Sequence, residues 1–194
     1  QKKKIKNQQP LKKKEIIEKI NHQVIQIKRV SKVVKGGKKL SFRAITIVGI
    51  KNKRGVVGIG IGKADDIKNA IDKAISKGKK NLITIPVTKN YTVPHSVLGL
   101  YGASSVIIKP SALGSGVIAG SSIRTVLEIA GISNIVAKQI GSNNLLNSAR
   151  ATLNALMKLK TISQIAKNRG IKIDSLFINK KKIKDASKKT PTRK

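Results

Sequence analysis

The stretch that most constrains the fold runs from residue 29 to residue 64, where β-branched and basic residues alternate between glycine turns. Alternation with a period of two predicts half-buried strands, and the pair Gly36-Gly37 marks a turn between two of them. Glycine then recurs at every second position over residues 58–62. Glycines on one face of a strand leave room for a second backbone. The stretch therefore predicts a three-stranded sheet in which one strand is open to close approach.

The same periodicity sets the bounds of the first unit. We expect strands over residues 22–34, 40–49 and 56–61, a basic hairpin loop over 51–55, and a short helix over 15–21 ahead of them. A longer helix over 67–80 follows the third strand. Asp65 and Asp66 precede this helix, where carboxylates can cap N–H groups and favour the helix dipole. Its predicted buried stripe consists of Ile67, Ala70, Ile71, Ala74 and Ile75.

The second half of the chain predicts a further α+β unit. Extended segments are expected at 81–88, 104–109 and 134–140, and helices at 123–130, 145–159 and 161–169. Gly131 is placed to end the helix before it. The expected order is β-β-β-α followed by β-β-α-β-α. We accordingly expect an α+β fold with a basic extension at 1–21, a first domain at 22–86, a second at 87–170 and a basic tail at 171–194.

The charge of the chain points to a polyanionic partner. Forty-two Lys and Arg face eight Asp and Glu, which gives a net charge of +34. Such an excess repels itself unless a polyanion is bound. A membrane surface is the lesser candidate, because no apolar run reaches about 18 residues and the cations are spread along the chain. Since aromatic residues make up only 2% of the chain, phosphate contacts and RNA shape should outweigh base stacking.

Residues that could support catalysis are scarce. The chain has no Cys, so it offers neither a disulfide nor a cysteine-based metal site. His22 and His95 are far apart in sequence, and the eight acids form no evident acid–base pair. We therefore expect no catalytic residue, no cofactor and no metal site. No signal-peptide pattern is seen at the start of this sequence.

Two glycine-rich stretches resemble nucleotide-binding motifs only in part. Three residues separate Gly58 from Gly62, and Ala64 supplies no hydroxyl for a magnesium ion, so a phosphate loop is disfavoured. The stretch 114–120 approaches a dinucleotide fingerprint, but its last spacing is one residue too long. What remains is a helix N-terminus that could attract phosphate, including RNA phosphate. For the strand over 58–62, the close neighbour is expected to be RNA backbone or another strand.

The residues also resemble a known family. The segments are RVSKVVKGGKKLSFRAITIVG, VGIGIGKA, PSALGSGVIAG, RTVLEIAGI, AKQIGSNN and NSARAT. Together they are similar to small ribosomal subunit protein five, most of all to its plastid and cyanobacterial members. The similarity runs in unbroken order over about residues 26–169. Two departures are Lys28, where many members carry Asn, and the hairpin IKNKRG after Gly49.

This resemblance implies an N-terminal domain like a double-stranded-RNA-binding domain. It also implies a C-terminal domain of the fold shared with translocation-factor and small-molecule-kinase domains, a fold that carries no activity by itself. Members bind small-subunit ribosomal RNA near the neck between body and head, and contact ribosomal proteins four and eight. They also border the path by which messenger RNA enters, and they influence decoding accuracy. The loop 34–37 would reach toward the head.

From the charge and the resemblance together, we expect a non-enzymatic structural protein of the small ribosomal subunit that is not a homo-oligomer. Its expected place is the plastid ribosome, with the bacterial cytoplasm as the alternative. A free RNA chaperone or helicase cofactor, and a nucleotide hydrolase that depends on Lys63, are the rival functions. The expected RNA contacts are cations and turn residues of both domains: Arg29, Lys32, Lys35, Gly36, Gly37, Lys38, Lys39, Arg43, Lys51, Lys53, Arg54, Lys63, Lys109, Ser115, Gly116, Arg124, Lys138, Ser142, Asn143, Asn144 and Arg150.

Overall fold

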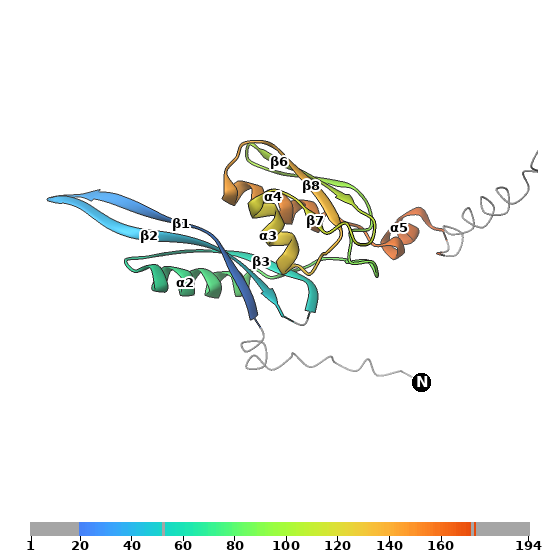
Figure 1. Cartoon of the computed structure of the whole chain (residues 1–194), viewed down its shortest axis with the longest axis horizontal. Coiled ribbons are helices and arrows are strands. Elements are labelled where there is room, and N and C mark those ends of the chain that lie inside the picture. Colours follow the sequence, from blue (N-terminus) through green and yellow to red (C-terminus); the bar gives the residue numbers. More distant parts are fainter. Residues whose placement is uncertain (1–19, 52, 172, 174–194) are drawn as a thin grey trace, which may run out of the picture.

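The computed structural model describes residues 20–51, 53–171 and 173, which form two four-stranded sheets with their helices (Figure 1). The first sheet has the order β1-β2-β3-β4 and is antiparallel throughout. Its elements are β1 (Ile20–Val34), β2 (Gly37–Ile50), β3 (Lys53–Ala64), helix α2 (Ile67–Lys80) and the short β4 (Ile83–Thr84).

The second sheet has the order β5-β6-β8-β7, with β7 parallel to β8 and the other pairs antiparallel. Helices α3 and α4 cover one of its faces (Figure 1). Its elements are β5 (Val97–Tyr101), β6 (Ser104–Pro110), β7 (Val117–Ile118), α3 (Ser121–Ile129), β8 (Ile135–Gly141), α4 (Leu145–Met157) and α5 (Ile162–Arg169). The predicted α+β class and the two-unit organisation are confirmed.

The glycine strand β3 is approached by helix α2, and not by RNA or a neighbouring strand as the sequence suggested. A Cβ at Gly58, Gly60 or Gly62 would lie under 3.0 Å from backbone atoms of α2 or the residue that ends it. The helix side of this contact is equally small, because its buried residues are Ala70, Ala74 and Gly78. The predicted stripe is right at Ala70 and Ala74, its residues Ile71 and Ile75 are half-buried, and it is wrong at Ile67, which is 44% exposed. Only small residues fit on a contact line this close.

One hydrophobic core joins the two halves of the chain. Helix α3 packs between the sheets, with buried Ile123, Val126 and Leu127. From the first sheet, Ile45, Ile47, Val57 and Ile59 belong to the core; from the second half, Val106, Ile108, Leu153 and Leu156 do. The two halves therefore do not bury separate cores. A rigid relation between the sheets follows, since close-packed interiors resist shear.

The hairpin of β1 and β2 extends beyond the third strand. The last pair of β2 with β3 is Phe42 with Ala64, whereas β1 and β2 stay paired up to Val34 and Gly37. Residues 30–41, which we call the arm, are thus a two-stranded ribbon that projects from the body (Figure 1). The turn at its tip depends on glycine, because Gly36 has φ of 93°.

Several expected bounds of the first domain were wrong. Strand β1 already includes Ile20, so a helix over 15–21 is wrong at its end, and the rest of that range lies outside the described residues. The basic loop is shorter than expected because β3 begins at Lys53. Asp66 does occupy the N-cap of α2, but its side chain makes no capping hydrogen bond and accepts one from Asn69 Nδ2 instead, at 3.0 Å.

The second half differs from expectation mainly in its strands. Only Ile83–Thr84 of the segment 81–88 forms a strand, and β5 and β7 were not predicted at all. Gly131 ends α3 as expected, with φ of 74°, and α5 begins with a capping box at Thr161. Among the described residues, no helix is long and apolar enough to cross a membrane.

Candidate nucleic-acid interface

Three cations stand in a row across the first sheet. In the register of the strands, Lys28 lies opposite Arg43, and Arg43 lies opposite Lys63. Directly opposed residues point to the same face of a sheet and have Cβ atoms about 4.5–5.5 Å apart. Like charges at such a spacing are unfavourable, so the row stores repulsion that a bound anion relieves.

A second pair extends this row along the arm. Lys32 lies opposite Lys39, and each is an even number of positions from the row on its own strand, so both point to the same face. Lys28, Lys32, Lys39, Arg43 and Lys63 are together called the cationic face. Within the described residues, the only carboxylate paired with it is Asp65, 3.8 Å from Lys39 Nζ. Because both partners of that ion pair are exposed, it neutralises little.

The Arg43 side chain leaves a donor unused at the centre of the row. Its Nε is buried, yet it has no hydrogen-bond partner among the described residues. Buried polar atoms are almost always paired, so this nitrogen has unfilled capacity for an acceptor. A phosphate oxygen, which takes charge-assisted hydrogen bonds from guanidinium groups, would meet that need.

A groove runs from this row to the start of helix α4. It has a volume of about 430 Å³ and is lined by Gln26, Lys28, Arg43, Asn143, Asn144 and Leu145. Asn144 caps the helix, because its Oδ1 accepts a hydrogen bond of 3.1 Å from the Leu146 N–H. The structure thus brings Arg43 together with the predicted turn residues of the other domain. It adds Lys28, which was absent from the predicted contacts although its identity was already noted as a departure.

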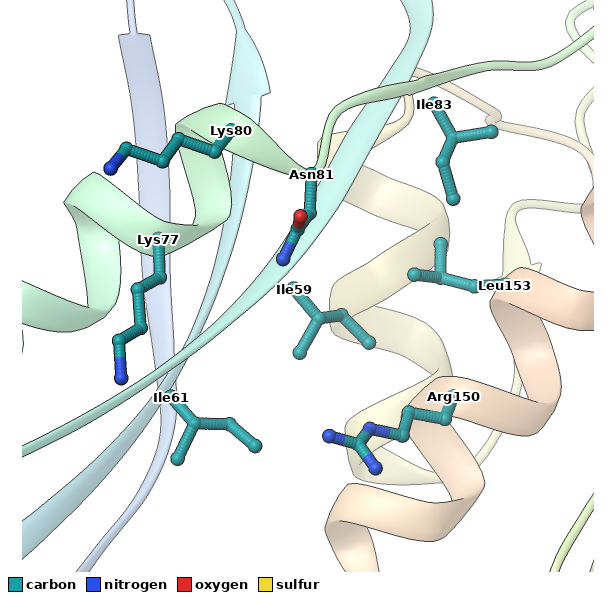
Figure 2. Close-up of a pocket in the computed structure, with 8 residues that line it drawn as sticks. All are labelled: Ile59, Ile61, Lys77, Lys80, Asn81, Ile83, Arg150 and Leu153. Atoms are coloured by element: carbon teal, nitrogen blue, oxygen red, sulfur yellow. The ribbon is translucent and has the colours of Figure 1, made fainter.

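A second basic groove lies between helices α2 and α4 (Figure 2). Its volume is about 560 Å³, and aliphatic side chains of β3, β4 and α4 form its floor. Lys77 and Lys80 line the groove from α2, and Arg150 lines it from α4 (Figure 2). Arg150 is held in place by Tyr101, whose ring lies 5.0 Å from its guanidinium and whose hydroxyl accepts a hydrogen bond from Nη1. The two lysines were absent from the predicted contacts.

The remaining contacts predicted on the first domain fall into two places. Lys35 and Lys38 are exposed at the tip of the arm, and Arg29 is exposed on the face opposite the cationic face, across from Phe42. Lys51, Lys53 and Arg54 lie at the other end of β2 and β3, far along the strands from the arm. Arg54 has an internal partner, because its guanidinium lies 4.1 Å from the centroid of the Tyr91 ring.

Several predicted contacts of the second domain already take part in internal interactions. Arg124 Nε donates to Glu128 at 2.7 Å, and Ser115 Oγ donates to the Ala112 carbonyl at 2.9 Å. The Ser142 carbonyl accepts from Ser104 Oγ and from Gln139 Nε2. Gly116 is exposed with φ of 72°. Lys109 and Lys138 stand on the outer face of the second sheet, apart from the cationic face.

The histidines and acids do not assemble into a reactive centre. His95 Nδ1 lies 2.9 Å from the Ser96 carbonyl, and its Nε2 accepts a hydrogen bond of 3.1 Å from the Lys160 N–H. The His95 ring thus joins two loops. In the part of the chain that the structure describes, no group of three His, Asp or Glu side chains could hold a metal ion.

Comparison with known proteins identifies the family. Residues 20–86 match Ribosomal protein S5, N-terminal domain, and residues 99–169 match Ribosomal protein S5, C-terminal domain. The chain belongs to the ribosomal protein S5 family. Members of the S5 family are structural constituents of the ribosome and are not enzymes, so the nucleotide-hydrolase alternative is set aside.

Individual S5 relatives fall into plastid and cyanobacterial groups. Small ribosomal subunit protein uS5c of Rhodomonas salina is 62% identical over 148 residues, which cover 76% of this chain and 87% of that protein. The uS5c of Cyanophora paradoxa is 61% identical over 148 residues, 76% of this chain and 86% of its own length. The uS5 of Nostoc punctiforme is 59% identical over 155 residues, 80% and 87% of the two chains. The predicted resemblance to plastid and cyanobacterial members is confirmed.

Proposed function

We propose that this chain is a constituent of the small ribosomal subunit that holds ribosomal RNA through phosphate contacts on its cationic face and arm. The observation that carries the proposal is the row Lys28–Arg43–Lys63, which places like charges side by side. Repulsion of this kind destabilises the free protein and is relieved when an anion binds in the working state. RNA backbone supplies regularly spaced anions, and the two grooves beside the row give it a path toward the second domain.

The finer features of the proposal rest on the family. Lys35, Gly36, Gly37 and Lys38 at the arm tip would reach toward the head, and the body of the protein would sit near the neck. Ribosomal proteins four and eight are the proposed protein neighbours, with messenger RNA nearby. Support for translational accuracy follows from that position. The limits 22–86 and 87–170 remain our domain division, and the proposed location is the plastid ribosome, with the bacterial cytoplasm as alternative.

Directed cleavage of RNA tests the proposal. Because the chain has no Cys, a single introduced Cys carries a tethered iron chelate at a known position. In assembled small subunits, Lys39→Cys and Lys63→Cys should cleave overlapping stretches of ribosomal RNA, since both stand on the cationic face. Lys160→Cys, an exposed position outside that face, serves as the control and should cleave elsewhere. Absence of cleavage from the two face positions would refute the proposed interface.

A free RNA chaperone or helicase cofactor is the rival function, because basic arms can also anneal or melt duplexes. Sedimentation at moderate salt separates the two. A structural constituent is found with small subunits, whereas a chaperone is found mainly in the free fraction. A free fraction that dominates in cell extracts would overturn the structural proposal.

A further inference from the structure

The groove between helices α2 and α4 has an aliphatic floor that an RNA backbone alone does not match. Ile59 and Ile61 come from β3, Ile83 from β4 and Leu153 from α4. Ile61 and Ile83 are only half-buried, so part of each side chain borders the open groove. Phosphates and ribose hydroxyls lose hydration against such side chains without gaining a partner. The floor therefore fits a flat apolar group better than it fits a phosphate.

Cations stand on both sides of this floor. Figure 2 shows Lys77 of α2 and Arg150 of α4 on either side of Ile61. Among the described residues, no Asp or Glu lines the groove. The Arg150 guanidinium donates one hydrogen bond to the Tyr101 hydroxyl, and a guanidinium has five N–H donors. The rim of the groove can therefore hold a phosphate by charge-assisted hydrogen bonds.

Helix α2 carries further lysines along the edge of β3. Lys73 and Lys77 are four positions apart, so they are neighbours on the helix surface. Lys73 lines a groove that also contains Lys63 of the cationic face, and Lys77 lines the groove between α2 and α4. Like charges at this spacing destabilise a helix slightly, so the stability of α2 does not explain them. They form a line of positive charge from the cationic face to the aliphatic floor.

The size of the groove and one amide suit a nucleotide. The volume of about 560 Å³ lies within the range of small-molecule sites, about 300–1,000 Å³. Asn81, at the end of α2, points toward Ile59 (Figure 2). An asparagine amide can pair with N6 and N7 of adenine. Bases that leave a stack are held in this way, by apolar side chains against their faces and hydrogen bonds at their edges.

We propose that this groove binds a single unstacked nucleotide, whose base lies on the aliphatic floor and whose phosphate lies between Lys77 and Arg150. The nucleotide comes either from a bulge or loop of RNA or from a free nucleoside monophosphate, since both present the same groups. The first source rests on the proposed function, and the second does not. From either source the groove recognises a base, whereas the cationic face recognises backbone.

Methyl NMR of the free protein tests for the base. Adenosine monophosphate should move the methyl signals of Ile61 and Ile83 through the ring current of adenine, whereas inorganic phosphate should not. The methyl signals of Ile140, which is 49% exposed outside the groove, should stay in place. Lys77→Gln should weaken the affinity for adenosine monophosphate at least threefold. The matched control Lys68→Gln, exposed on the same helix but outside the groove, should leave it unchanged.

Filling the groove tests the RNA source. Ile83→Trp places an indole on the floor and keeps Lys77 and Arg150, while Leu113→Trp, at a position 67% exposed outside the groove, is the control. In complexes with small-subunit RNA, wild type and control should protect one unpaired base from modification at its Watson–Crick edge. Ile83→Trp should make that base at least fivefold more reactive and leave backbone protection along the cationic face unchanged. If the indole unfolds the protein, Ile83→Ser removes the floor instead and is read in the same way.

The results separate the groove from the wider interface. Ring-current shifts confined to the groove support a free nucleotide, and a single base released by Ile83→Trp but not by Leu113→Trp supports RNA. If neither is seen, the proposal is overturned. Methyl shifts as large at Ile140 as at Ile61 would also overturn it, because they would show non-specific binding. A wild-type protein that binds no ribosomal RNA would overturn the proposed function, and the methyl titration would then decide on the groove alone.

Discussion

Removing the cationic row should weaken RNA binding and stabilise the free protein at the same time. The change is Lys28→Gln, Arg43→Gln and Lys63→Gln together, which keeps the side chains polar and lowers the net charge from +34 to +31. Weaker RNA binding together with a more stable free protein would show that the row repels itself until an anion binds. An ordinary structural role would lower stability instead.

The binding term follows from counterion release. Each phosphate neutralised contributes about 0.9 to the slope of log affinity against log salt for a duplex. Three lost contacts should therefore reduce the slope by about 2.7. At 0.15 M salt the same relation corresponds to a loss of roughly 10²-fold in affinity if the non-electrostatic part is unchanged.

The stability term follows from Coulomb repulsion. Two adjacent pairs exist in the row, Lys28 with Arg43 and Arg43 with Lys63. For charged groups about 7 Å apart in water, each pair costs about 0.6 kcal/mol. The variant should therefore gain up to about 1 kcal/mol in the free energy of unfolding at low salt, and the gain should shrink as salt rises.

The assay is filter binding to isolated small-subunit RNA from 50 to 400 mM salt, beside urea unfolding of the free protein. The matched control, Lys89→Gln with Lys160→Gln and Lys167→Gln, removes the same charge from exposed positions outside the row. If the control variant lowers the slope of log affinity against log salt as much as the row variant does, binding depends only on net charge. That outcome, or a row variant less stable than wild type, would refute the reasoning.

Three further changes separate packing from recognition. Gly60→Ala places a Cβ against the backbone of α2 and should lower the free energy of unfolding in urea by about 1–3 kcal/mol. The control Gly120→Ala has open space around it and should lower it little. Equal effects of the two changes would contradict the close contact. Gly36→Val should leave the melting temperature of the whole protein nearly unchanged, but amide protons of the arm should exchange faster, because a φ of 93° disfavours a β-branched residue. Incorporation into subunits should fall, or translational accuracy should change. An unaltered ribosome would argue against the role of the arm tip. Arg54→Gln should lose about 0.5–1 kcal/mol of stability with the salt slope nearly constant, because its guanidinium stacks on Tyr91; a slope lower by about 0.9 would restore it as an RNA contact.

The sequence predicted the cations of the interface but not their grouping. Alternation placed Arg43 on a strand, but the expected third strand ended at residue 61, short of Lys63, and the pattern could not show that the two residues oppose one another. Register depends on the turns: β3 begins at Lys53, three positions earlier than the expected loop allowed. A change of one position would have sent the side chains to the other face. Lys28 entered the interface only when that pairing was known.

The missed strand β5 has a specific cause. Gly99 sits at its centre, and an isolated glycine usually weakens a strand. In the structure, a Cβ at Gly99 would lie under 3.0 Å from atoms of α4. Gly60 allows α2 the same close approach. The sequence signal was recognised where three glycines repeat and was missed where one stands alone.

Internal partners hold two of the predicted arginine contacts, one outside the interface and one inside it. Arg54 and Tyr91 are far apart in sequence, and Arg150 finds Tyr101 only because α4 lies across β5. The chain has two Tyr, and each has an arginine stacked on it. A basic residue near an RNA-binding loop is therefore not necessarily free for RNA. Pairings of this range depend on tertiary contacts that local patterns do not contain.

Both sheets are packed in the same way on one face, and their opposite faces differ in the chemistry of their side chains. In each sheet a helix presses closely onto a glycine-bearing strand, which leaves the far face to be covered by something else. Helix α3 covers that face of the first sheet only in part, and where the cover ends the side chains are cations. The far face of the second sheet stays uncovered, and its side chains are mostly aliphatic. Because α3 belongs to the core of both halves, the second sheet would hold the cationic face and the arm at a fixed orientation to RNA.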